Sequence, residues 1–195
     1  MARFTGSLAR VFALAALAVV ALGAPAAAAP VTLIDSNSFG ESWDTGGDWS
    51  DGQPAQAGND YHVGDSTGKN LRTPNDVSNP TFPGDSLTIH DTGALAFKHN
   101  GTVTIDDLRL DGGKIACWVG NRTMAVGGNL SVLSPSTIEM GGGNTRTTRL
   151  ESTLTGAAAL TLTGSGSPAR FILDADTSGY TGHWIVNPAL DNLYA

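Results

Sequence analysis

Several residue types are scarce in this chain, and each shortage excludes a class of protein. A single cysteine among 195 residues excludes a disulfide-held scaffold and a zinc site built on cysteines. Charged residues make up only 15% of the chain, and acidic residues outnumber basic ones by 18 to 11. Because the chain has no basic patch to neutralise phosphates, we expect no nucleic-acid partner. Hydrophobic residues, at 41%, are too frequent for a disordered chain.

The N-terminus has the parts of a secretory signal peptide, which we place at residues 1–29. Arg3 and Arg10 supply the basic part, an apolar run extends from Val11 to Gly23, and small residues follow at 24–29. The apolar run is too short to cross a bilayer about 30 Å thick as a helix, and no second run follows it. We therefore expect a bacterial protein that is secreted, extracellular or at the cell surface, with no membrane span in the mature chain.

Residues 30–84 are rich in turn formers, and we predict an irregular, loop-rich N-terminal cap there. Gly-Gly, Asp-Gly and Asn-Pro pairs supply the backbone angles that turns require. Two interpretations of the large aromatic residues are open, because their rings can pack over the end of the following domain or form an exposed platform for sugar rings. The candidates for sugar binding are Trp43, Trp49 and, near the C-terminus, Trp184.

The sequence pattern changes at residue 85, where short runs begin in which apolar residues alternate with Thr and Ser. This period of two predicts strands with one buried face, and no stretch after the signal peptide has helical periodicity, so the protein is expected to be all-β. Leu-x-Leu or Leu-x-Val cores recur at Leu108 and Leu130 and, after a longer interval, at Leu160. Repeats of roughly 20–25 residues with very short strands favour a solenoid. We predict a right-handed parallel β-helix over residues 85–195, with a jelly-roll β-sandwich as the alternative.

The end of the chain shows no obvious polar cap over the last predicted strand. A solenoid needs capped ends, because an open last coil exposes its core and its strand edges. We expect the chain to be the N-terminal piece of a longer protein, and a small folded-back cap formed by residues 187–195 is the alternative.

Two stretches resemble autotransporter-associated β-strand repeats, which occur in passenger-like β-helix proteins secreted by bacteria. Tyr180-Thr181-Gly182, followed by Trp184-Ile185-Val186, is similar to the Tyr-Thr-Gly core of those repeats and the strand after it. The segment 47–61 is similar to the opening of such proteins. The resemblance implies an exported β-helix, at the cell surface or extracellular, that is rarely enzymatic. This chain departs from the family in having one good Tyr-Thr-Gly unit and no recognisable translocator barrel.

Four aspartates are candidates for a Ca²⁺ site. Asp107 and Asp111 share one face of a predicted strand with Arg109, which fits a carboxylate cluster for Ca²⁺ or an acid/base pair. The simpler interpretation is that the arginine neutralises its acidic neighbours on a wet face. Asp174 and Asp176 open a stretch with the oxygen spacing of a Ca²⁺ loop, although Ile185 stands where the bidentate acid is needed. A turn between two strands explains the same stretch.

A catalytic set is not visible in the remaining residues. The histidines His62, His90, His99 and His183 are scattered, and none has a partner at metal-ligand spacing along the chain. Cys117 lies in an apolar alternation, which is typical of a buried thiol. No nucleophile elbow and no phosphate-binding loop is present.

These observations favour a non-catalytic β-helix segment, secreted or at the cell surface, with a structural or adhesive role and no cofactor other than a candidate Ca²⁺ ion. The alternative is a carbohydrate-active protein. It would be a binding module that uses the three tryptophans, or a β-helix polysaccharide lyase or hydrolase that uses Asp106, Asp107 and Asp111. The partners expected are extracellular polysaccharides or cell-surface components, and the oligomeric state is not indicated.

Overall fold

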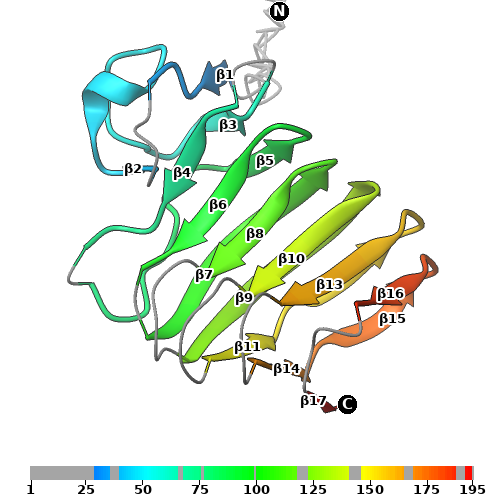
Figure 1. The fold of residues 1–195 in the computed structure, drawn as a ribbon. Coiled ribbons are helices and arrows are strands. Elements are labelled where there is room, and N and C mark those ends of the chain that lie inside the picture. Colours follow the sequence, from blue (N-terminus) through cyan, green and yellow to red (C-terminus); the bar gives the residue numbers. More distant parts are fainter. Residues whose placement is uncertain are drawn as a thin grey trace, which may run out of the picture.

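The protein is an all-β chain built from short parallel strands, as a computed structural model shows (Figure 1). The structure describes residues 29–35, 40–65, 68–75, 77–98, 100–117, 123–140, 146–164, 169–187 and 192–194. The predicted signal peptide, apart from Ala29, lies outside these residues. The strands are β1 (Ala29–Thr32), β2 (Glu41–Ser42), β3 (Asn59–Val63), β4 (Asn70–Arg72), β5 (Ser86–His90), β6 (Ala94–Phe97), β7 (Gly101–Asp111), β8 (Lys114–Cys117), β9 (Thr123–Ser134), β10 (Ser136–Met140), β11 (Arg146–Leu150), β12 (Thr153–Gly156), β13 (Leu160–Gly164), β14 (Ala169–Leu173), β15 (Asp176–Tyr180), β16 (Trp184–Val186) and β17 (Asn192–Tyr194).

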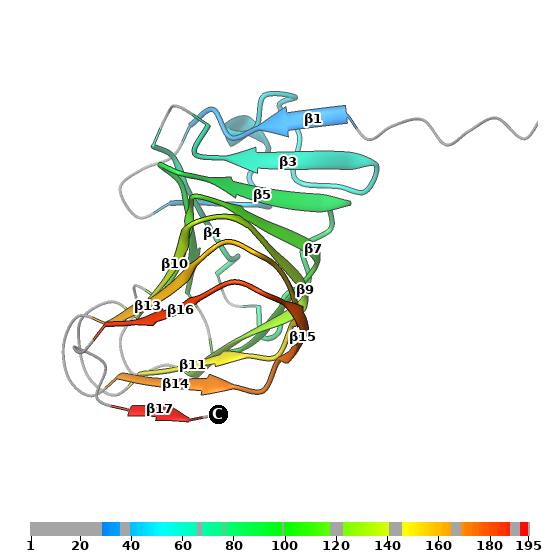
Figure 2. The same cartoon turned by 90° about the vertical axis from the view of Figure 1, so that its right-hand side faces the viewer.

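The strands form two parallel sheets that wind together as a β-solenoid. The ten-stranded sheet runs in the order β1-β3-β5-β7-β9-β11-β14-β17, with β12 beside β9 and β15 beside β12. The seven-stranded sheet runs in the order β16-β13-β10-β8-β6-β4-β2. Figure 2 shows the strands stacked from β1 at the top to β17 at the bottom. Because neighbouring strands are parallel, the solenoid prediction is confirmed, and the jelly roll, whose strands are antiparallel, is excluded.

From β7 onward each turn has three sides, and the solenoid makes about four such turns. The strands β7 and β9 are long because each bends round a corner and contributes to two sides, with a register shift between Ile105 and Leu108. In the next two turns these two sides are separate strands, β11 and β12, then β14 and β15. Side-chain contacts between neighbouring turns join residues 23 positions apart (Asp106 and Asn129) or 24 apart (Ser131 and Thr155), in agreement with the predicted repeat.

The core consists of rows of apolar side chains stacked along the solenoid axis. Alternate residues of each strand point inward, and parallel pairing places each one beside its counterpart in the next turn. All members of the two main rows in the turns from β3 to β13 are almost completely buried. The rows are Tyr61, Leu87, Leu108, Leu130 and Leu154 in the ten-stranded sheet, and Leu71, Leu95, Ile115, Ile138 and Leu162 in the seven-stranded sheet.

Glycine forms the corner where β9 passes from one side to the next. Gly128 has a φ of +89°, and a Cβ atom there would lie 2.0 Å from the carbonyl oxygen of Ile105 in the neighbouring turn. Both the left-handed backbone and the close approach require glycine.

Residues 30–84 combine the predicted loops with strands β1 to β4, so this segment contributes to both sheets. Its loops close the N-terminal end of the solenoid. Trp43, Trp49, Tyr61 and Phe82 pack edge to face there and are at most 3% exposed. Among the described residues, no helix has the length and apolar character needed to span a bilayer.

Candidate functional site

The first two sugar-binding candidates lie inside the protein. The ring of Trp49 is completely buried, packs against Tyr61 at 4.7 Å between centroids, and donates an Nε1–H hydrogen bond of 3.2 Å to the carbonyl of Trp43. Trp43 itself is 3% exposed and packs against Phe82. Neither tryptophan therefore presents a ring face on which a sugar could stack, and both close the N-terminal end of the core.

Trp184 has a different environment in the last turn. It is partly buried and packs edge to face against Tyr180, with 5.3 Å between centroids. The Tyr180 hydroxyl donates to the carbonyl of Ala158 at 2.8 Å, which fixes its ring beside the tryptophan. Trp184 is thus the one of the three candidate tryptophans that keeps solvent exposure.

The aspartates of β7 do not converge on one point. Asp107 accepts a hydrogen bond from the guanidinium of Arg109, and this contact raises the pKa of the arginine. Asp111 instead lies 3.3 Å from Nδ1 of His90 and accepts a hydrogen bond from the hydroxyl of Ser134. The two carboxylates therefore serve separate neighbours.

The aspartates after β14 form the turn into β15. A carboxylate oxygen of Asp174 lies 3.1 Å from the guanidinium of Arg149. Asp176 accepts a hydrogen bond of 3.0 Å from the backbone N–H of Ser178, which lowers the pKa of this exposed carboxyl. Within the described part of the chain, no group of three or more His, Cys, Asp or Glu side chains is arranged to hold a metal ion.

A chain of polar contacts that sequence reasoning did not find runs across the outer face of the ten-stranded sheet. His62 on β3 and His90 at the end of β5 are 28 positions apart, yet Nδ1 of His62 lies 3.0 Å from Nε2 of His90. Asp111 and Ser134 extend the contacts into the next two turns. Spacing within one strand could not reveal this pair. The usable information was the repeat length, which places residues of neighbouring turns side by side.

The two imidazole rings meet end to end. Their planes are nearly parallel, at 12°, and their centroids are 5.3 Å apart. The distance between the two nitrogens is shorter than the distance between the ring centroids by about two ring radii, so the nitrogens lie on the line that joins the centroids. This is the geometry of a hydrogen bond in the ring plane and not of a face-to-face stack. Burial, followed by the neighbouring His90, lowers the pKa of His62 below its ordinary value, so His62 is neutral at neutral pH.

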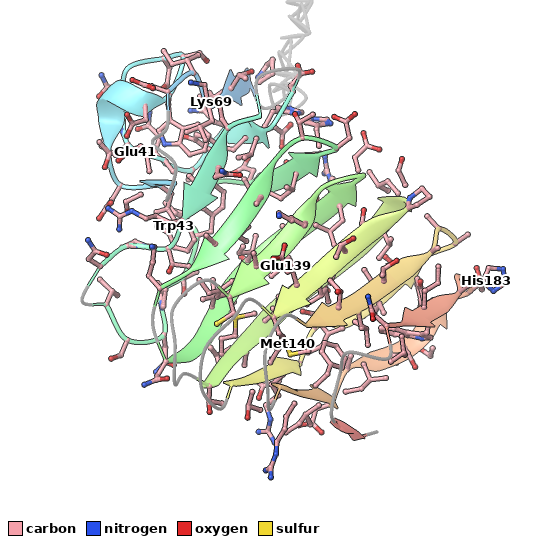
Figure 3. The ribbon with its side chains drawn as sticks, in the orientation of Figure 1. Glu41, Trp43, Lys69, Glu139, Met140 and His183 are labelled. Carbon is pink, nitrogen blue, oxygen red and sulfur yellow. The ribbon has the colours of Figure 1, made fainter. Side chains whose placement is uncertain are left out.

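The outer face of the seven-stranded sheet carries short polar side chains and ion pairs. Thr137, Thr161 and Thr163 point outward from β10 and β13, while Lys114 and Glu139 of adjacent turns form an ion pair of 2.8 Å. Figure 3 shows Glu139 on this sheet. This outer face therefore presents threonine side chains and the ion pair, which lie in register from turn to turn.

A group of carboxylates lies near the N-terminal end. Asp35 forms an ion pair of 3.6 Å with Lys69, and one oxygen of Asp48 is buried without a hydrogen-bond partner. Burial and the nearby charges of Glu41 and Asp35 raise the pKa of Asp48. These side chains surround the loop that carries Trp43 and Trp49.

Comparison of this chain with protein-family models, with curated proteins and with solved structures found no match, so the β-solenoid fold is established without a family.

Proposed function

We propose that the chain is an exported β-solenoid with a structural or adhesive role in the extracellular space or at the cell surface. The observation that carries the proposal is the character of the outer faces. Short hydroxyl side chains of successive turns are in register, as with Ser131 and Thr155, whose oxygens are 3.0 Å apart. The charges of Lys114 and Glu139 are paired between turns. Such faces suit repeated weak contacts over a wide area better than reaction at one point.

The predicted signal peptide and the resemblance of the Tyr-Thr-Gly unit to autotransporter-associated repeats support the export of this fold. Tyr180-Thr181-Gly182 lies at the corner between β15 and β16, where a Cβ atom on Gly182 would lie 2.1 Å from the carbonyl oxygen of Ala158. The unit thus turns the chain into the next strand, which is what the resemblance to autotransporter-associated repeats implies for it.

Two measurements test the proposal. The full chain is expressed in a bacterium and located by fractionation, with a variant lacking residues 1–29 as control; we expect export of the full chain only. Beads coated with the exported protein are then assayed for attachment to bacterial cells. We expect Thr161→Lys with Thr163→Lys, on the outer face, to reduce attachment several-fold, and the exposed loop variant Thr45→Lys to leave it unchanged. A cytosolic full chain contradicts the proposal, and no attachment at all contradicts the adhesive role and leaves only the structural one.

A second candidate function is the binding of extracellular polysaccharide at the last turn. Its support is the partial exposure of Trp184 beside Tyr180, because tryptophan faces stack on the CH groups of sugars. A glycan array with the purified chain tests it. Saturable binding that Trp184→Ala abolishes and Ile185→Ala retains, with both variants folded by circular dichroism, supports a binding module. Cleavage of a bound glycan would indicate a lyase or hydrolase. No binding to any glycan on the array would rule out this second function.

A further inference from the structure

His62 and His90 form a junction between successive turns at which two ring nitrogens face each other at 3.0 Å. The rings are held by parallel strands that pair directly, since β3 and β5 are adjacent in the ten-stranded sheet. Both side chains lie on the outer face and are half-buried, so water and ions reach them.

Asp111 lies on the far side of His90 from His62. Its carboxylate is an acceptor 3.3 Å from Nδ1, and it is itself fixed by the hydroxyl of Ser134. In the tautomer of His90 that carries its proton on Nδ1, toward this carboxylate, the lone pair of Nε2 points at His62. A carboxylate behind a histidine in this way orients the ring and increases the basicity of the opposite nitrogen, as in carboxylate–histidine–metal arrangements.

The charges around the pair favour a cation. The negative charges of Asp60 and Asp65 act on His62, while the positive charge of Arg109 opposes them and is hydrogen-bonded to Asp107.

We propose that His62 and His90 form a binding site for one divalent transition-metal ion of the Zn²⁺, Ni²⁺ or Cu²⁺ class, with Asp111 as the positioning residue behind His90. The ion binds Nδ1 of His62 and Nε2 of His90, and water completes its coordination. These are the metals that imidazole ligands suit. Metal–nitrogen bonds of about 2.0–2.1 Å place the ion off the line between the two nitrogens, so each ring must turn to point its lone pair at the ion, and the nitrogens move a few tenths of an ångström further apart than they are now.

The protons balance without an added acid or base. In the metal-free pair with His90 protonated on Nδ1, Nδ1 of His62 is the donor and Nε2 of His90 the acceptor. On metal binding this proton leaves Nδ1, and Nε2 of His62 takes up one from solvent, so the imidazole stays neutral and the metal replaces the shared proton as the link between the rings. His90 keeps its proton on Nδ1, toward Asp111. With two protein ligands, the ion remains exchangeable with solvent.

The test uses the full chain without a polyhistidine tag. Zn²⁺ is titrated by calorimetry at pH 7.5, and Cu²⁺ is followed by electron paramagnetic resonance. We expect one equivalent of each metal, a copper spectrum with two nitrogen ligands, and a loss of at least about tenfold in affinity for His62→Ala or His90→Ala. Asp111→Asn is expected to weaken binding by about 10–100-fold while both nitrogens remain in the copper spectrum. His183→Ala is the matched control, because this histidine projects from the corner between β15 and β16 (Figure 3), and it should bind as the parent does.

A second measurement uses only the parent chain, so its result does not depend on whether the variants fold. In the parent chain, ¹⁵N spectra of the histidine rings should show Nδ1 of His62 and Nε2 of His90 shifting on addition of Zn²⁺, with His183 unchanged. Three results would overturn the proposal: no binding by the folded parent, an affinity in both alanine variants equal to that of the parent, or a parent copper spectrum with fewer than two nitrogen ligands.

Discussion

Leu108 and Leu130 lie directly opposite each other in the register of β7 and β9, and both side chains are completely buried. Leu87 precedes them and Leu154 follows them in the same row. Each leucine therefore lies between apolar side chains of the preceding and the following turn. Because the row is enclosed on both sides, neighbouring side chains can fill a cavity within it only in part.

We expect Leu130→Ala to lower the free energy of unfolding by about 2–5 kcal/mol, because the row closes only partly around the cavity that is left. The matched control is Leu133→Ala on the same strand, where the parent side chain is 56% exposed and the change should stay within about 0.5 kcal/mol. Urea unfolding followed by circular dichroism measures both. Equal losses in the two variants would contradict the row as the source of stability.

Thr148 is a polar member of another inward row, between Met124 and Phe171, and its buried hydroxyl has no hydrogen-bond partner. A buried hydroxyl without a partner costs about 1–3 kcal/mol. Thr148→Val keeps the shape of the side chain and replaces the hydroxyl with a methyl group, so we expect it to stabilise the protein by about 1 kcal/mol or more. Thr161→Val, on the outer face, is the control and should give no such gain. A thermal shift downward for Thr148→Val would refute the prediction.

The glycine corner of β9 offers a third measurement. Gly128→Ala introduces a Cβ atom 2.0 Å from the carbonyl oxygen of Ile105 and forces a non-glycine residue to a φ of +89°. The backbone alone costs about 1–3 kcal/mol, and the clash adds to this. Gly47→Ala, where a Cβ atom meets nothing within 4 Å, should be neutral. A tolerated Gly128→Ala would mean that β7 and β9 can separate at the corner.

The sequence predicts the repeat correctly where the apolar spacing is local. Leu108 and Leu130 were identified as equivalent, and they are paired. Leu160 is not the next member of that row, because Leu154 follows Leu130 while Leu160 pairs with Ser136 in the other sheet. The alternation of a short strand is the same on every side of a solenoid, so sequence alone does not assign a strand to its side.

The candidate site was predicted less well, since lateral contacts depend on register. The acidic residues of β7 share a strand face as expected, but Asp107 contacts Arg109 of its own strand, while Asp111 contacts His90 of the preceding turn. The pairing of His62 with His90 requires a precise turn length, and loop insertions between β3 and β5 obscure that length in the sequence.

The lowered pKa of His62 predicts that stability depends on pH. Burial and then His90 lower the pKa of His62 in the folded chain below the ordinary 6.5, with Arg109 acting in the same direction and Asp60 and Asp65 opposing it. The unfolded chain therefore takes up a proton at a higher pH than the folded chain does. The contribution is fully present above pH 6.5 and is lost as the pH falls through the lowered pKa of the folded state.

We expect the unfolding free energy of the parent to fall more steeply between pH 7 and pH 5 than that of His62→Gln, with a chelator present to exclude metal effects. The amide side chain keeps a hydrogen-bonding group beside His90 but does not titrate. His183→Gln should follow the parent curve, because that histidine is exposed and does not contact the pair. Urea unfolding at several pH values measures the three slopes. Parallel curves for the parent and His62→Gln would show that the half-buried imidazole carries no part of the pH dependence, and a steeper curve for the variant would reverse the assigned sign.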